Sequence, residues 1–164
     1  STTNTKLSPV LDTQRISAFT VQNRLNQPTS SNTPDFVDDE ANTGTSSAAV
    51  YLTRPIVLDT ASTALDIRLT ANVRSTSSIR VYYRVSSSEE VRNIDDLNWI
   101  PFNTDGSEDT TITPAEDDTT FKEYKFSDTG IHDFTAFQIK IIMKGTISSY
   151  PPKIRDMRGI ALAV

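Results

Sequence analysis

The sequence predicts an all-β protein, an antiparallel β-sandwich with jelly-roll connectivity and an extended N-terminal arm. About eight short segments alternate apolar and polar residues with a period of two, and polar turns rich in Ser, Thr and Asp separate them. No long segment has the period of a helix. Immunoglobulin-like connectivity is the alternative, although the Cys–Trp–Cys framework typical of that fold is absent.

The β pattern begins near residue 48. Residues 50–53 and 56–58 are mostly apolar and flank Pro55, which is typical of an edge strand or a bulge. Residues 65–71 alternate most regularly and predict a half-buried strand. Residues 79–85 alternate in the same way, and the serine-rich turn before them predicts that these two strands form a hairpin.

Polar connections dominate the middle of the chain. Residues 86–96 predict a polar connection with one helical turn, and residues 97–102 predict a strand that stops near Pro101. Residues 103–120 predict a long acidic loop, because they combine turn-forming residues with many carboxylates.

Three strands joined by two turns are predicted between residues 121 and 164. The first contains Tyr124 and Phe126, which alternate with charged residues. The second is expected to have one apolar face and one mostly polar face, because two sets of residues alternate: Phe137, Ile139, Ile141 and Met143 against Gln138, Lys140, Ile142 and Lys144. Residues 160–164 are apolar, and we expect this last strand to lie buried at the centre of a sheet.

Residues 1–47 are expected to form a polar N-terminal arm and linker, and residues 48–164 the β-sandwich domain. The region 27–47 is rich in Pro, Gly, Ser, Thr and Asp, which favours a linker. Ser17, Phe19 and Val21 predict a short strand. The alternative is an extended arm that docks Ile16, Phe19 and Val21 on a partner.

Composition excludes several classes of function. The net charge of −5 disfavours binding to a nucleic-acid backbone or to an anionic membrane surface. The chain has no cysteine, so it has no disulfide, thiol nucleophile or zinc–thiolate site. No apolar run approaches the ~20 residues of a membrane span, and the first residues lack the apolar core of a signal peptide.

Catalytic signals are weak. His132, the single histidine, is followed by Asp133, so a base oriented by a carboxylate is one interpretation. An ordinary turn before a strand is the favoured interpretation, because adjacent side chains on a strand point to opposite faces. No Gly-x-Ser-x-Gly motif marks a nucleophile. We therefore expect a protein that is not an enzyme and has no cofactor.

The acidic loop offers one weak candidate for a metal site. Asp105, Glu108 and Asp109 supply the oxygen ligands that calcium prefers. The spacing of an EF-hand is missing, so a solvated acidic loop is the favoured interpretation.

The clearest candidate for recognition is the row Arg80, Tyr82 and Arg84, which is expected to share one outward face. Such a face can bind a protein partner, or it can be a solvated face with cross-strand pairs. Tyr82, Trp99 and Tyr150 are candidates for stacking on a glycan, although Trp99 is also expected to fill the core.

The series of strands resembles the C-terminal β domain of large virion structural proteins, of the tail or baseplate type, in T-even-like myophages and especially in marine cyanophages. The polar lead-in, residues 7–12, resembles the segment that precedes this domain. The residues that carry the resemblance are 49–58, 65–72, 78–84, 97–99, 121–126, 137–143 and 151–162.

The resemblance implies a non-enzymatic part of a tail, baseplate or neck, located in the virion and assembled in the host cytoplasm. Its partners would be other virion proteins, and a homo-oligomer is compatible with this role; neither nucleic acid nor membrane is expected as a partner. The alternative is an adhesion module that binds host surface glycan through the aromatic residues above or through the acidic loop with calcium.

Overall fold

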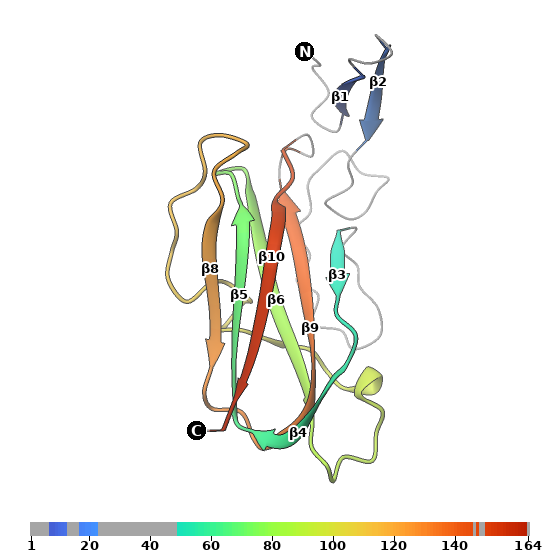
Figure 1. Ribbon diagram of the computed structural model, residues 1–164, viewed down its shortest axis with the longest axis vertical. Coiled ribbons are helices and arrows are strands. Elements are labelled where there is room, and N and C mark those ends of the chain that lie inside the picture. Colours follow the sequence, from blue (N-terminus) through green and yellow to red (C-terminus); the bar gives the residue numbers. More distant parts are fainter. Residues whose placement is uncertain (1–6, 13–16, 23–48, 146, 148–149, 164) are drawn as a thin grey trace.

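The computed structural model describes residues 7–12, 17–22, 49–145, 147 and 150–163. The fold is all-β, as predicted, and its strands pair antiparallel in two facing sheets (Figure 1). One sheet has the order β10-β5-β8. These strands are Lys153–Leu162, Ala64–Asn72 and Lys122–Asp128.

The second sheet has the order β3-β9-β6-β7, and β4 also pairs with β9. Its strands are Val50–Leu52, Phe134–Gly145, Ser77–Ser86, Ile100–Pro101 and, for β4, Ile56–Ser62. The predicted helical turn is the short 3₁₀ helix η1, Ile94–Asp96. Two further strands, β1 (Leu7–Asp12) and β2 (Ser17–Gln22), pair with each other.

Consecutive strands cross between the sheets, which is the connectivity of a jelly roll. The chain passes from β5 to β6, from β8 to β9 and from β9 to β10, changing sheet each time. A jelly roll has about four strands in each sheet. The β10-β5-β8 sheet is one strand shorter, and the position beside β10 is not filled by a strand of the sandwich.

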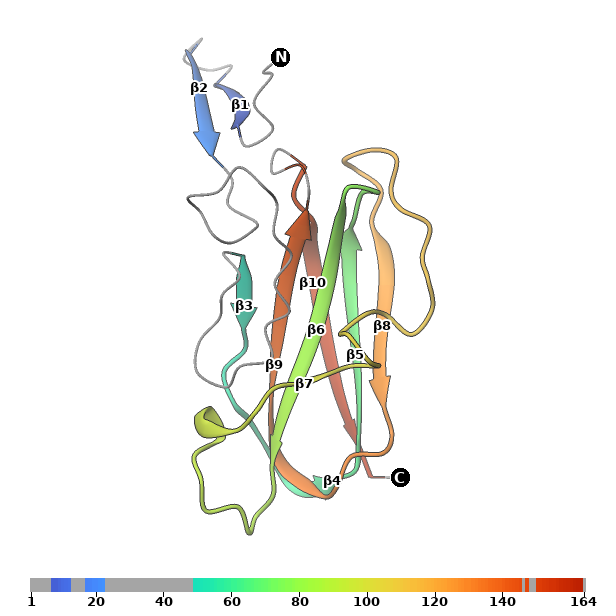
Figure 2. The ribbon, with the colours of Figure 1, turned by 180° about the vertical axis from the view of Figure 1, so that it is seen from behind.

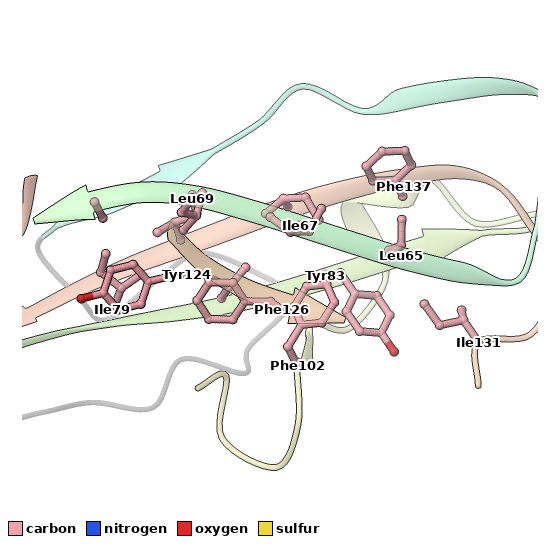
Figure 3. Close-up of a cluster of buried hydrophobic side chains, with 14 of the residues drawn as sticks. Leu65, Ile67, Leu69, Ile79, Tyr83, Phe102, Tyr124, Phe126, Ile131 and Phe137 are labelled. Atoms are coloured by element: carbon pink, nitrogen blue, oxygen red, sulfur yellow. The ribbon is translucent and has the colours of Figure 1, made fainter. Parts of the chain in front are cut away.

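The core lies between the two sheets. Leu65, Ile67 and Leu69 alternate along β5 and are almost completely buried. They pack with a row of aromatic rings, in which the ring centroid of Phe102 lies 4.9 Å from that of Tyr83 and 6.2 Å from that of Phe126 (Figure 3). Burial of each large apolar side chain contributes roughly 1.5–3 kcal/mol, so this row is a main source of stability.

The hairpin predicted from residues 65–71 and 79–85 is wrong. The turn exists, with the N–H of Ser77 donating to the carbonyl of Arg74 at 3.0 Å. However, β5 and β6 belong to different sheets, and β6 pairs with β9 over its whole length. A short polar turn looks the same in the sequence whether it joins paired strands or crosses the sandwich.

The central position predicted for the last strand is also wrong. β10 lies at an edge and pairs with β5 only, among the described strands. Ile160 and Leu162 keep 43% and 44% of their surface exposed. The terminus is paired, as expected, but its apolar residues are divided between the core and the surface.

Candidate interaction surfaces

The face of Arg80, Tyr82 and Arg84, expected to point outward, is covered. Tyr82 is 1% exposed and Arg84 is 4% exposed, while Arg80 is partly exposed. Figure 2 shows the connection through η1 and β7 crossing the outer side of β6. The prediction of an outward face is therefore wrong for Tyr82 and Arg84.

Arg84 anchors this covering connection. Its Nη1 donates to the carbonyl of Asp95 at 2.8 Å, its Nε donates to Oε1 of Gln138 at 2.7 Å, and its guanidinium forms an ion pair with the Asp95 carboxylate. Burial lowers the pKa of Arg84, and the carboxylates of Asp95 and Asp96 oppose this shift. The result is a buried, paired cation that fixes η1 on the sheet.

Trp99 completes the layer under the connection. The guanidinium carbon of Arg84 lies 4.4 Å from the centre of the Trp99 ring. Nζ of Lys140 lies 4.9 Å from the centres of both the Trp99 and Tyr82 rings. These cation–π contacts make a second, smaller core outside the sandwich, in which Tyr82 and Trp99 are fully enclosed.

The face of β9 expected to be mostly polar contributes Lys140 and Ile142 to this second core. Its polar members, Gln138, Lys140 and Lys144, are each at most 5% exposed. The alternation of residues along β9 is therefore as predicted, but both faces of the strand are buried.

Gly106 allows the connection to approach β6. It has a φ of 82°, and its carbonyl accepts from the N–H of Val81 at 2.8 Å. A Cβ on Gly106 would lie 3.0 Å from the Val81 carbonyl oxygen and 3.1 Å from the Val81 nitrogen. Only glycine fits this contact without a shift of the backbone.

The three aromatic residues predicted to stack on a glycan do not share one rim. Tyr82 and Trp99 are buried in the second core, whereas Tyr150 is 48% exposed. Tyr150 lies beside Arg74, whose guanidinium carbon is 5.5 Å from the ring centre.

Two of the three carboxylates predicted as weak calcium ligands, Asp105 and Asp109, have protein partners. Asp105 pairs with Arg80 at 3.3 Å, and a hydrogen bond from Ser107 lowers the pKa of Asp105. Asp109 accepts from the Ser127 N–H at 2.9 Å and from its hydroxyl at 2.6 Å. Glu108 borders a small cavity with Arg74 and Arg80. Over the residues that the structure describes, no group of three or more His, Cys, Asp or Glu could hold a metal ion.

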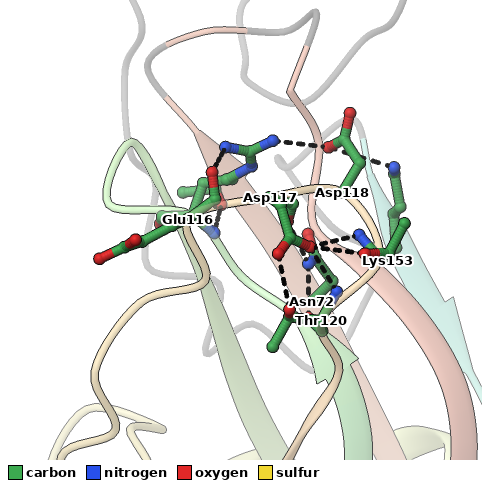
Figure 4. A network of polar contacts seen from close by, with 9 residues as sticks. Asn72, Glu116, Asp117, Asp118, Thr120 and Lys153 are labelled. Carbon is green, nitrogen blue, oxygen red and sulfur yellow. Dashed lines mark hydrogen bonds and ion pairs between the residues drawn. The ribbon is translucent and has the colours of Figure 1, made fainter.

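The rest of the acidic loop is bound to the end of the sandwich (Figure 4). Nδ2 of Asn72 donates to the carbonyls of Asp117 and Thr120, at 2.8 and 2.6 Å. Asp118 pairs with Arg74 at 3.0 Å and with Lys153 at 3.3 Å. The loop is therefore attached to the domain rather than simply solvated.

His132 and Asp133 lie in the turn before β9 and are both exposed. They border a shallow cavity of about 200 Å³ together with the polar residues Ser87, Ser88, Glu89 and Thr135. No hydrogen bond joins His132 to a serine or carboxylate in the described part of the chain, so the geometry supplies no oriented base.

A groove between the sheets was missed by the sequence reasoning. It holds about 350 Å³, opens between β3 and β10, and is bordered by Tyr51, Ile141, Met143 and residues 154–157. Tyr51, on its β3 side, is 52% exposed. Two signals mark this flank in the sequence: Pro55 beside β3, and the charged residues of β10, which are typical of edge strands.

The N-terminal candidates are only partly described. Ile16 lies outside the described residues. Phe19 and Val21 lie on β2, where Phe19 stands opposite Val10 and Val21 opposite Ser8. The predicted short strand at residues 17–21 is therefore confirmed, and the preceding lead-in forms its partner β1.

A scan against protein-family models finds no match, and searches of curated proteins and of solved structures also find none. Within the described residues, no helix has the length and apolar character needed to cross a membrane.

Proposed function

We propose that this chain is a non-catalytic assembly module of a tailed-phage virion, in the tail, baseplate or neck, and that it acts through contacts with other virion proteins. The resemblance of the strand series supports the virion setting. The distribution of apolar surface supports the mode of action.

The proposal rests on the exposed flank formed by β3, β4 and β10. Tyr51, Leu52 and Val57 are 52%, 47% and 79% exposed, and they belong to strands at one edge of the sandwich. The groove beside Tyr51 reaches toward Ile141 and Met143 of β9. An aromatic residue next to an apolar groove with a charged rim is typical of a protein-binding surface.

The polar groups with strongly displaced pKa values have structural partners. Hydrogen bonds from Thr119 and Thr120 lower the pKa of Asp117, and these bonds shape the acidic loop. Burial, together with the hydrogen bond to Asp128, raises the pKa of Tyr83. Because these groups stabilise the fold, they give no support to a catalytic role.

The test is to measure binding of the full chain to proteins released from dissociated virions. Tyr51→Lys places a charge at the mouth of the groove and should weaken binding by about tenfold or more, since truncation of a central aromatic contact commonly costs over 1 kcal/mol. Val91→Lys is the matched control, because Val91 is 97% exposed and lies outside the groove.

Unchanged binding by Tyr51→Lys, or an equal loss in both variants, would contradict the proposed surface. Absence of any binding by the wild-type chain would contradict the assembly role itself.

A further inference from the structure

The free edge of β10 is a long, regular strand edge. β10 has ten residues and pairs only with β5 among the described strands (Figure 1). Its register with β5 runs without a shift from Asp156 to Leu162. Such an edge presents a row of N–H and C=O groups on which another strand can pair.

The orientation of one carbonyl identifies the groups that face outward. The carbonyl of Leu162 accepts from the N–H of Thr63 at 2.8 Å, so it points toward β5. Backbone groups alternate in direction along an antiparallel strand. The N–H and C=O groups of Met157, Gly159 and Ala161 therefore point to the free edge.

The side chains at these three positions leave the edge accessible. Met157 and Ala161 pack against the core between the sheets. Gly159 has no side chain, and a Cβ there would meet Ile67 Cδ1 at 3.3 Å, on the core side. No side chain of Met157, Gly159 or Ala161 is therefore directed along the row of free backbone groups.

The chain contains a second sheet with an unpaired edge, among the described strands. β1 and β2 form a two-stranded sheet that pairs with no other described strand, and an isolated hairpin of this kind is marginally stable in water. β1 contains Pro9, which lacks an N–H and favours an edge position. β2 contains neither Pro nor Gly, and Phe19, Thr20 and Val21 favour a strand. The open side of β2 is therefore the side suited to a third strand.

We propose that β2 of one copy adds to the free edge of β10 in a second copy of this chain, giving the strand order β1-β2-β10-β5-β8. This inference rests on the proposed assembly function and names a partner for it. The six residues of β2 fit within the regular segment of β10 from Asp156 to Leu162. The added strand takes the position beside β10 that a fourth strand occupies in a jelly roll with two complete sheets.

A second copy is the partner because, among the strands that the structure describes, β2 pairs only with β1 of its own chain. Residues 23–49 join β2 to β3, and an extended chain of this length spans on the order of 90 Å at about 3.3 Å per residue. The connection is therefore long enough for the hairpin to reach a neighbouring molecule.

The experiment uses two full-length variants whose mass is measured by analytical ultracentrifugation, alone and mixed. Ala161→Pro removes an N–H that faces the free edge and leaves the bonds to β5 in place. Thr20→Pro alters β2 at the position opposite Pro9, where β1 has no N–H to donate. The wild type should be larger than a monomer, each variant alone should be monomeric, and the 1:1 mixture should form a dimer of twice the monomer mass.

The mixture is diagnostic because it retains one intact β2, on the Ala161→Pro chain, and one intact β10 edge, on the Thr20→Pro chain. Ala161→Ser keeps the N–H and should assemble as the wild type does. Ile160→Lys combined with Leu162→Lys provides a second block that leaves the ladder to β5 intact, since lysines on an edge strand oppose strand addition.

A mixture that stays monomeric, or variants that assemble as well as the wild type, would overturn the proposal. A monomeric wild type would also overturn it, and slow hydrogen exchange at the amides of Gly159 and Ala161 would then show that the chain's own segment covers the edge. None of these results bears on binding to dissociated virion proteins, so failure of this inference is distinguishable from failure of the assembly role.

Discussion

Trp99 is held between two cations, and this arrangement decides which residues are available for binding. The Arg84 guanidinium carbon lies 4.4 Å from the ring centre, and Nζ of Lys140 lies 4.9 Å from it. The stems of long cationic side chains can be buried when their charges have partners. The charged residues in the sequence therefore predict an exposed face. In the structure, aromatic and carboxylate partners that are distant along the chain allow the same residues to be enclosed.

Replacing Trp99 with alanine should lower the free energy of unfolding by about 3–5 kcal/mol, because it leaves a cavity and removes the partner of two buried cations. Urea unfolding followed by circular dichroism measures this change. Tyr150→Ala, at an exposed aromatic residue, is the control and should change stability by only about 0.5 kcal/mol. Comparable losses in the two variants would mean that Trp99 is not enclosed as the structure indicates.

The pKa of Asp117 predicts a dependence of stability on pH. Hydrogen bonds from Thr119 and Thr120 hold this pKa well below its usual value in the folded protein. Asp117 therefore stabilises the fold above the unfolded-state pKa of about 3.9, and this contribution is lost as the pH falls toward the folded-state pKa.

Asp117→Asn should lower the urea midpoint at pH 7, and the difference from wild type should shrink on acidification to about pH 2–3. Glu116→Gln is the control, because the backbone carbonyl of Glu116, and not its carboxylate, accepts from Arg74. A difference that persists unchanged at low pH would show that the charge of Asp117 is not responsible.

At the level of the elements, alternation predicted the strands but not their neighbours. β5, β6, β8 and β9 lie where the period of two places them. The sheet to which each belongs depends on contacts across the sandwich, so the turn between β5 and β6 was misread as a hairpin. β10 was placed centrally because its end is apolar, although Asp156 and Arg158 on its outer face are typical of an edge.

The short strand β7 and its connection depend on Gly106. Gly106→Ala should lower the free energy of unfolding by about 1–3 kcal/mol, because a side chain is strained at this positive φ and meets the backbone of Val81. Gly130→Ala is the matched control, since its nearest contact, Asp128 Oδ1, is at 3.7 Å. Thermal unfolding of the two variants compares them, and equal effects would argue against the close contact between Gly106 and β6.

At the scale of the whole molecule, the fold class was predictable because it needs only the period, the turns and the absence of helical pattern. The site was not predictable in the same way. The side-chain chemistry of Arg80, Tyr82 and Arg84 predicts a binding face, but the connection from β6 to β7 covers most of that face. The exposed flank of β3 and β10 depends on which strands lie at the edges, and strand order is a property of the complete fold.

The most direct test of the account is backbone hydrogen exchange, measured on the free chain and on the chain bound to virion proteins. We expect exchange to slow on binding in residues 50–57, because β3 and β4 at the exposed flank would be covered. Slowing confined to the acidic loop at residues 103–120 or to the turn around Tyr150, with no change at β3 and β4, would contradict the account.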